Sequence, residues 1–314
     1  MNAGPVRIRF APDLVEAVVE RWLRGEGPGA DSGLPARYRR ETDRIYTLYD
    51  RAEERRGAFQ ALHTRLFEAL RCGEAVVEEA QALAGRSDGI LVGRAWTRAE
   101  EGAELSADRR MVGLRVLPER FSSPEGLRTF LRHEFGHAFD MLDDAFGYGA
   151  GAPSAPGALP RVTGERFGVL WDCVVDGRTE RTGGVPLHRR EDLVEACARL
   201  YPALPRAAVT AVVARLWAGE RPTYTALLAW ATDPGVLAAS VGASPESAGA
   251  VEVPPPPGAS CPLCGFPTHA WAHPVDAAVA RRIQEDVPRW VPALGVCARC
   301  VEAYAVTASA GGAA

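Results

Sequence analysis

The stretch LRHEFGHAFDMLDD, residues 131–144, contains two histidines four positions apart and a glutamate directly after the first. Residues four apart lie on the same face of a helix, so His133 and His137 could direct imidazole nitrogens at one metal ion. Tetrahedral zinc accepts such ligands. Glu134 would lie close to the ion without binding it, which leaves its carboxylate to act as a general base. The pattern therefore predicts a catalytic zinc site.

A catalytic zinc usually has three protein ligands and one water, so a third ligand must come from another part of the chain. The stretch LWDCVVDGRTE (170–180) places Asp172, Asp176 and Glu180 on one face of a second helix. Their neighbours are apolar, and a carboxylate in apolar surroundings needs a partner. Of these acids we favour Asp176 as the third ligand.

Other acids could take the same role. Glu191 and Glu195 are spaced by four in REDLVEACARLYP, and Asp143 follows His137 by six positions. The alternatives to Asp176 are therefore Glu191, Asp172 and Asp143. Groups that could donate a hydrogen bond to a reacting oxyanion are Tyr148, His188, Tyr201 and Arg178.

A second metal site is predicted near the C-terminus. Two CxxC pairs, CPLC and CARC, supply four sulfur ligands: Cys261, Cys264, Cys297 and Cys300. Four thiolates close the coordination shell of zinc without an open position, which is typical of a structural site. The chain has 7 cysteines, and we expect the remaining ones to be buried free thiols: Cys72, Cys173 and Cys197.

The HExxH stretch and the strand expected before it, Met111–Leu117, resemble the zincin metallopeptidases, in particular the lethal-factor-type and related glutamate-zincins. The resemblance covers about residues 85–200. It implies a zinc-dependent peptidase in which the strand before the active helix forms a sheet edge that pairs with an extended substrate. The C-terminal cysteines resemble a zinc ribbon or treble-clef module. SprT-type proteases have a similar order of domains, with a histidine such as His188 as third ligand.

Two stretches after the motif also resemble family patterns. The Asp172–Glu180 stretch resembles the EDxRxE helices of bacterial metalloprotease-like families, which implies Asp176 as a ligand or as a hydrogen-bond partner of one. The same resemblance implies that Arg178 orients a carboxylate. The Glu191 stretch resembles the glutamate-zincin helix, in which the first acid binds zinc and the second contacts a ligating histidine.

The hydrophobic pattern predicts a mainly helical α+β protein with a zincin-like core and a small zinc-binding module. Strands are expected over 89–97 and 111–118, and the HExxH helix should begin at Ser123, a good N-cap, followed by Pro124. Other helices are expected over 12–24, 36–72, 74–84, 164–180, 190–202, 206–218 and 223–232. The expected division is an N-terminal helical region (1–84), a metallopeptidase domain (85–250), a proline-rich linker (251–260) and a four-cysteine zinc-binding module (261–314).

Composition limits the other interpretations. The net charge of -4 gives no reason to expect general nucleic-acid binding, and only a few arginines near the cysteines favour it (Arg281, Arg282, Arg289 and Arg299). We expect no membrane span and no signal peptide, and therefore a cytoplasmic location. The sequence predicts two zinc ions, one catalytic and one structural, and a peptide or protein substrate. The alternative is a non-catalytic metal-binding adaptor whose C-terminal module binds protein or nucleic acid. The oligomeric state is not indicated.

Overall fold

The structure is a computed structural model that describes residues 6–28, 33–149, 159–243, 255, 258–272, 274–288 and 290–310. Contacts between residues group the chain into two compact units. The first unit consists of Met1–Cys197 and Thr210–Asp233, and the second of Ala198–Val209 and Pro234–Ala314. Most of the expected linker 251–260, and residues 150–158 of the Gly- and Pro-rich stretch after the HExxH helix, lie outside the described residues.

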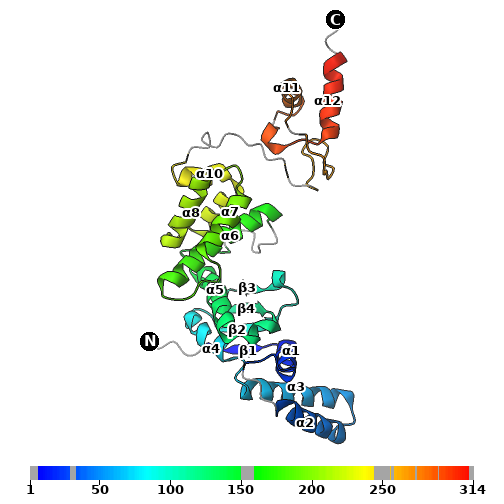
Figure 1. Ribbon diagram of the computed structural model, residues 1–314, viewed down its shortest axis with the longest axis vertical. Helices are drawn as coiled ribbons and strands as arrows, with labels where there is room; N and C mark the ends of the chain where they lie inside the picture. The colour runs from blue at the N-terminus through cyan, green and yellow to red at the C-terminus, as the bar shows by residue number, and fades with distance from the viewer. Residues whose placement is uncertain are drawn as a thin grey trace. The chain divides into compact units, whose positions relative to one another are not determined.

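Helices dominate both units, as expected from the sequence (Figure 1). Those that begin in the first unit are α1 (Pro12–Leu23), α2 (Leu34–Leu48), α3 (Ala52–Ala69), α4 (Glu74–Glu79), α5 (Pro124–Leu142), α6 (Arg161–Arg181), α7 (Arg190–Leu200) and α9 (Tyr224–Thr232). The others are α8 (Arg206–Ala218), α10 (Pro234–Ser240), α11 (Ala277–Asp286) and α12 (Ala298–Ala310). The long helix expected over 36–72 is interrupted at residues 49–51, so that α2 and α3 are separate. No helix in the described ranges is long and apolar enough to cross a membrane.

A small mixed sheet lies in the first unit (Figure 1). Within the described residues it has four strands in the order β1-β2-β4-β3. These are β1 (Ile8–Phe10), β2 (Gly89–Arg94), β3 (Gly102–Leu105) and β4 (Met111–Val116). β2 pairs in parallel with β1 and β4, and β3 pairs antiparallel with β4. Successive side chains of a strand point to opposite faces, and here one face carries the buried residues Ile90, Val92, Val112, Leu114 and Val116.

The structure confirms the strands expected over 89–97 and 111–118 as β2 and β4, but it adds β1 and β3. β1 comes from the region expected to be purely helical, so residues before 84 contribute to the sheet. β3 lies in a stretch interpreted from the sequence as a polar loop. The expectation that Met111–Leu117 forms the sheet edge is wrong, because β4 has a partner on both sides. The edge strand next to the HExxH helix is β3.

The HExxH helix, α5, starts where the sequence predicts. The Ser123 hydroxyl accepts a hydrogen bond from the Gly126 N–H at 3.2 Å, and Pro124 occupies the first helical position. α5 packs against α4 and β3 on the sheet side and against α6 on another side. It therefore holds the two histidines between the edge of the sheet and a second helix.

The helices α5 and α6 approach closely at a glycine. A Cβ atom added to Gly136, in the middle of HEFGH, would lie 2.6 Å from the Cγ1 of Val175. Real Cβ atoms do not come this near, so a larger residue would push α6 away. Since Val175 directly precedes Asp176, this contact fixes the distance from the acids of α6 to the histidines of α5.

The C-terminal module, residues 258–310, has its own small core. The buried residues that form it are Cys261, Val279, Ile283, Trp290, Val296 and Cys297. Trp290 is 1% exposed, and its indole N–H donates to the Gly295 carbonyl at 2.9 Å. Isolated bridges join Ser260 to Pro267 and Trp271 to Cys297, in place of an extended sheet. Two of the buried core residues are cysteines, so two of the predicted metal ligands are also part of the packing.

Candidate metal centres

Three side chains of α5 and α6 bring nitrogen and oxygen atoms to one point. The Nε2 atoms of His133 and His137 are 3.1 Å apart. The Oδ1 atom of Asp172 lies 3.4 Å from the first and 3.2 Å from the second. Ligands of a tetrahedral zinc at about 2.0–2.1 Å lie roughly 3.3 Å from one another. This group can therefore hold a metal ion.

Asp176, one turn further along α6, meets His133 on its other ring nitrogen. The Nδ1–H of His133 donates to Asp176 Oδ1 at 2.9 Å. Asp176 is fully buried, and its Oδ2 accepts from the Nδ1 of His188 at 2.9 Å. The backbone N–H groups of Leu187 and His188 also donate to this carboxylate, at 3.0 and 3.1 Å. His133, Asp176 and His188 thus form a second group of potential ligands that shares one histidine with the first.

When no metal is bound, the acids of the two groups stabilise a positive charge on the histidines, and the histidines stabilise the negative charges of the acids. Burial opposes a charge on His133, but hydrogen bonds to Asp172 and Asp176 outweigh it and raise its pKa to about 10. Burial likewise opposes ionisation of both acids, whereas the histidines lower the pKa of Asp172 far below its usual range and that of Asp176 to about 2. The hydrogen bond to Asp176 raises the pKa of His188. The buried carboxylate of Asp176 and the partly buried carboxylate of Asp172 thus require a positive charge beside them, which a proton on His133 or a metal ion can provide.

The Nδ1 of His137 is buried without a hydrogen-bond partner among the described residues, so no hydrogen bond at this nitrogen orients the ring. Packing positions this side of the ring instead. Its ring stands edge-on to Trp171, with the ring centroids 4.4 Å apart. The Trp171 N–H in turn donates to Asp140 Oδ2 at 2.9 Å. A mostly buried ion pair completes this arrangement, since Arg178 donates to both oxygens of Asp140, at 2.6 and 3.1 Å. Arg178 orients a carboxylate, as expected, and that carboxylate belongs to the HExxH helix.

We expect Asp140→Ala to lower the free energy of unfolding by roughly 3–5 kcal/mol, because it leaves the Arg178 guanidinium buried without its partner. The measurement is urea unfolding of the full chain followed by circular dichroism. The matched control is Glu165→Ala, which breaks an exposed ion pair with Arg161 on the same helix and should leave the unfolding midpoint almost unchanged. Equal midpoints for the two variants would contradict a structural role for the Asp140–Arg178 pair.

Glu134 lies beside the first group of potential metal ligands and contacts the edge strand. Its Oε2 accepts a hydrogen bond from the Ala103 N–H of β3 at 2.9 Å. A cleft of about 350 Å³ runs between β3 and α6, and Glu134, His137 and Asp172 all line it. The base predicted from the sequence and two of the potential ligands therefore face the same solvent-accessible space.

The remaining candidates for the third ligand do not reach the histidines, and the candidate oxyanion donors differ in their access to the cleft. Asp143 ends α5, where its Oδ1 accepts from the Ala145 N–H, and Glu191 is exposed at the start of α7. Neither belongs to a potential metal group in the described part of the chain. Among the oxyanion candidates, Tyr148 lines the cleft, whereas Tyr201 is 1% exposed and Arg178 is occupied by Asp140.

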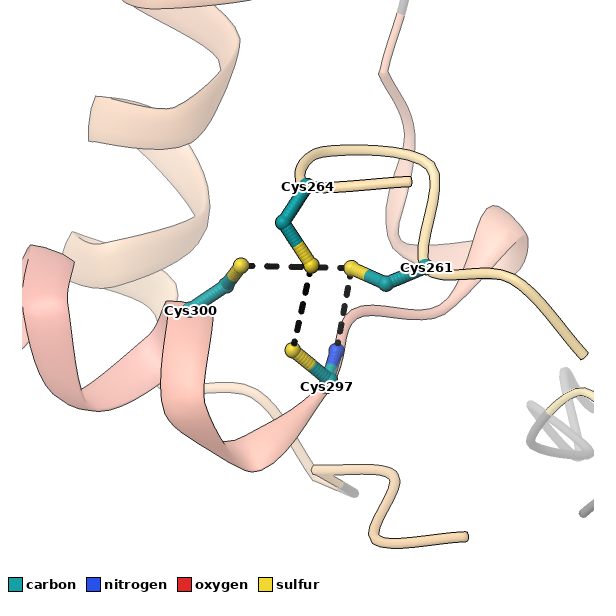
Figure 2. Close-up of side chains that lie close together, drawn as sticks. All are labelled: Cys261, Cys264, Cys297 and Cys300. Carbon is teal, nitrogen blue, oxygen red and sulfur yellow. Dashed lines mark hydrogen bonds between the residues drawn. The ribbon is translucent and has the colours of Figure 1, made fainter. Parts of the chain in front are cut away.

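The four C-terminal cysteines form a third group. Figure 2 shows their sulfur atoms pointing toward a common centre. The Sγ atoms of Cys261 and Cys300 are 3.9 Å apart, and so are those of Cys264 and Cys297. Sulfur ligands of tetrahedral zinc, at about 2.3 Å from the ion, have roughly this spacing. The structure therefore confirms that the two CxxC pairs form a group that can bind a metal ion.

Backbone N–H groups favour the ionised form of one of these cysteines, Cys261. Burial disfavours the Cys261 thiolate, but N–H groups of Cys297, Cys264 and Leu263 donate to its sulfur and together lower its pKa to about 7. Of the two histidines between the cysteine pairs, His269 is exposed and belongs to no potential metal group, and His273 lies outside the described residues. The other cysteines are buried and free, as expected: Cys72, Cys173 and Cys197.

Sequence reasoning missed two contributors to the histidine site. Ala103 acts through its backbone N–H, which no residue type reveals. Trp171 supports His137, and the only available signal was its position directly before Asp172 on the acidic helix. A comparison of the chain with protein-family models, curated proteins and solved structures gave no match. The chemistry of the two centres must therefore be inferred from their own residues.

Proposed function

We propose that the chain is a zinc-dependent peptidase. The observation that carries the proposal is the convergence of His133 Nε2, His137 Nε2 and Asp172 Oδ1 within 3.4 Å of one another, beside a cleft that His137, Asp172 and Glu134 line. Two imidazoles, one carboxylate and an open side suit a catalytic zinc, whereas a structural site is closed on all sides. The motif's resemblance to the zincins supports the same activity.

In this proposal the third ligand is Asp172, and not Asp176 as favoured from the sequence. Asp172 faces the Nε2 atoms of both histidines, whereas Asp176 accepts the Nδ1–H of His133. That hydrogen bond fixes the tautomer in which His133 Nε2 has a free lone pair. Asp176 therefore orients a ligand without binding the ion itself.

Bound zinc would supply a Lewis acid that polarises the scissile carbonyl and makes a coordinated water more acidic. Glu134 accepts the proton of the attacking water and passes it to the leaving amine. The Ala103 N–H holds the Glu134 carboxylate toward the cleft. β3 pairs only with β4 in the described residues, so its other edge can accept an extended peptide by adding a strand.

The C-terminal module carries a structural zinc in the same proposal. Four thiolates leave no position for water, so this ion has no part in hydrolysis. Its role is to hold a module with a small core in a folded state. This agrees with the position of Cys261 and Cys297 inside that core.

The test of the function is Glu134→Gln. We expect zinc-loaded wild type to cleave an unfolded protein such as carboxymethylated casein, and the variant to be roughly 10²- to 10⁴-fold slower while its zinc content is unchanged. Zinc is measured by mass spectrometry and cleavage by the release of new amino termini. The matched control is Glu125→Gln, which changes an exposed acid in the first turn of the same helix that does not line the cleft, and which should keep its activity. Cleavage by Glu134→Gln at the wild-type rate would overturn the proposal.

A further inference from the structure

The cleft beside Glu134 has one wall made of aromatic rings. The side chains of Phe167 and Trp171 come from α6, and Tyr148 and Tyr224 come from the segments before α6 and at the start of α9. The rings of Phe167 and Trp171 are 5.5 Å apart, and those of Phe167 and Tyr224 are 4.9 Å apart. These contacts form one continuous apolar surface next to His137, which packs on Trp171.

Glycines keep this wall open. Gly164 and Gly168, one turn apart on α6, both line the cleft. Glycine is unfavourable in the interior of a helix relative to alanine, so a reason other than helix stability must account for Gly168. A Cβ atom added to Gly168 would meet nothing within 4 Å, so protein packing does not require the glycine. What it provides is free space beside the aromatic rings.

The charge around this space has one sign. The ionisable acids that line the cleft are Glu101, Glu104, Glu134 and Asp172. No arginine lines it among the described residues, and Glu101 is paired with Arg120 outside it. Away from the metal ion proposed at Asp172, an acidic side chain entering the cleft would therefore meet like charges, whereas an uncharged ring would meet apolar surface.

We propose that this cleft is a specificity subsite, which takes one large apolar side chain, an aromatic one above all, from a peptide bound along β3, and excludes acidic side chains. The inference rests on the proposed peptidase function, because it names the substrate class for that site. The volume of about 350 Å³ lies in the range of pockets that enclose a small ligand. The opposite wall is β3, the strand whose open edge would position the peptide backbone.

The test measures binding separately from turnover. The probes are blocked peptides of the form acetyl-Gly-Gly-X-Gly-amide with Phe, Ala or Glu at X, titrated calorimetrically into the zinc-loaded full-length Glu134→Gln protein. We expect the Phe peptide to bind roughly 10- to 100-fold more tightly than the Ala peptide, as expected for burial of one large apolar side chain, and the Glu peptide to bind most weakly. Hydrolysis of the same peptides is measured in parallel with wild type.

The decisive variant is Gly168→Leu in the same background, because a Cβ atom at this position meets nothing within 4 Å and a larger side chain can extend from it into the free space. It should remove the preference for the Phe peptide and leave binding of the Ala peptide within about 2-fold. Gly168→Ala should give a smaller effect of the same kind. Gly57→Leu is the matched control, since Gly57 also lies inside a helix, α3, with nothing within 4 Å of an added Cβ. It should change neither affinity.

The outcomes separate the subsite from the activity. Equal binding of the three peptides, or an equal loss for all of them in Gly168→Leu, overturns the subsite even when wild type hydrolyses peptides. If wild type hydrolyses no peptide but the Phe peptide still binds most tightly and loses this advantage in Gly168→Leu, the subsite stands and the peptidase function fails.

Discussion

The C-terminal module of a Cys297→Ser variant is expected to be unfolded at 25 °C, while the unit that contains the sheet keeps its structure. Among the described residues, the buried core of the module has six members, two of which are cysteines, and isolated bridges replace a sheet. Such a core supplies little stability, whereas zinc binding to sites of this kind contributes roughly 10–16 kcal/mol. Loss of one thiolate removes most of that contribution and also opens the core. We expect the loss of a single metal ligand to unfold a whole module only at the four-cysteine site.

Amide hydrogen exchange of the full chain, read by mass spectrometry, measures this effect. Peptides that cover α11 should exchange at the rate of an unfolded chain in Cys297→Ser and in chelator-treated wild type, and slowly in zinc-loaded wild type. Cys72→Ser is the control, since Cys72 is also buried but lies in the other unit and in no potential metal group. Slow exchange of α11 in Cys297→Ser would show that the module folds without its fourth sulfur.

The second large effect is expected at the histidine site, where two neighbouring acids should behave differently. In Asp172→Ala we expect zinc affinity at this site to fall by about 10³-fold or more and hydrolysis to disappear, because a ligand of the ion is lost. The four-cysteine site should still retain about one ion per chain. In Asp176→Asn we expect only a roughly 10- to 100-fold weaker affinity, as is typical when a partner of a ligating histidine is changed. The measurement is competition with a chromogenic zinc chelator, together with total zinc.

Glu191→Ala and Asp143→Ala complete this comparison, because both acids lie outside the potential metal groups and should leave zinc affinity unchanged. The reverse order, with Asp176→Asn losing the metal and Asp172→Ala retaining it, would show that the ion binds to His133, Asp176 and His188 instead. Loss of metal in Glu191→Ala would favour the glutamate-zincin pattern.

The parts of the histidine site that the sequence predicted depend on local rules. Helical periodicity alone places His133 and His137 on one face, and the Ser123 cap marks where the helix begins. The same periodicity places Asp172 and Asp176 on one face of α6. It could not decide which of them meets the Nε2 atoms, because this depends on how closely α5 and α6 approach. That distance is set by the contact between Gly136 and Val175, residues far apart in the sequence.

The longer strands of the fold could also be predicted from local patterns, whereas the short strands could not. β2 and β4 have six residues each and are mostly apolar, whereas β1 and β3 have three and four residues, too few to show an alternating pattern. β3 is also partly polar because it is an edge strand. α11 is not among the expected helices, although Asp276 precedes it as an N-cap and accepts hydrogen bonds from the N–H groups of Ala278 and Val279.

The carboxylate of Asp176 joins His133 to the backbone of Leu187 and His188, which lie in the connection between α6 and α7. Coupling between two sites is reciprocal. If His133 binds a metal ion and the ion holds the Asp176 carboxylate more firmly in this position, a molecule that binds the connection in the same conformation would increase the affinity for the ion. The connection between α6 and α7 would then be an allosteric site that controls how tightly the metal ion is bound. The half-exposed ring of His188 would make this site accessible from the surface.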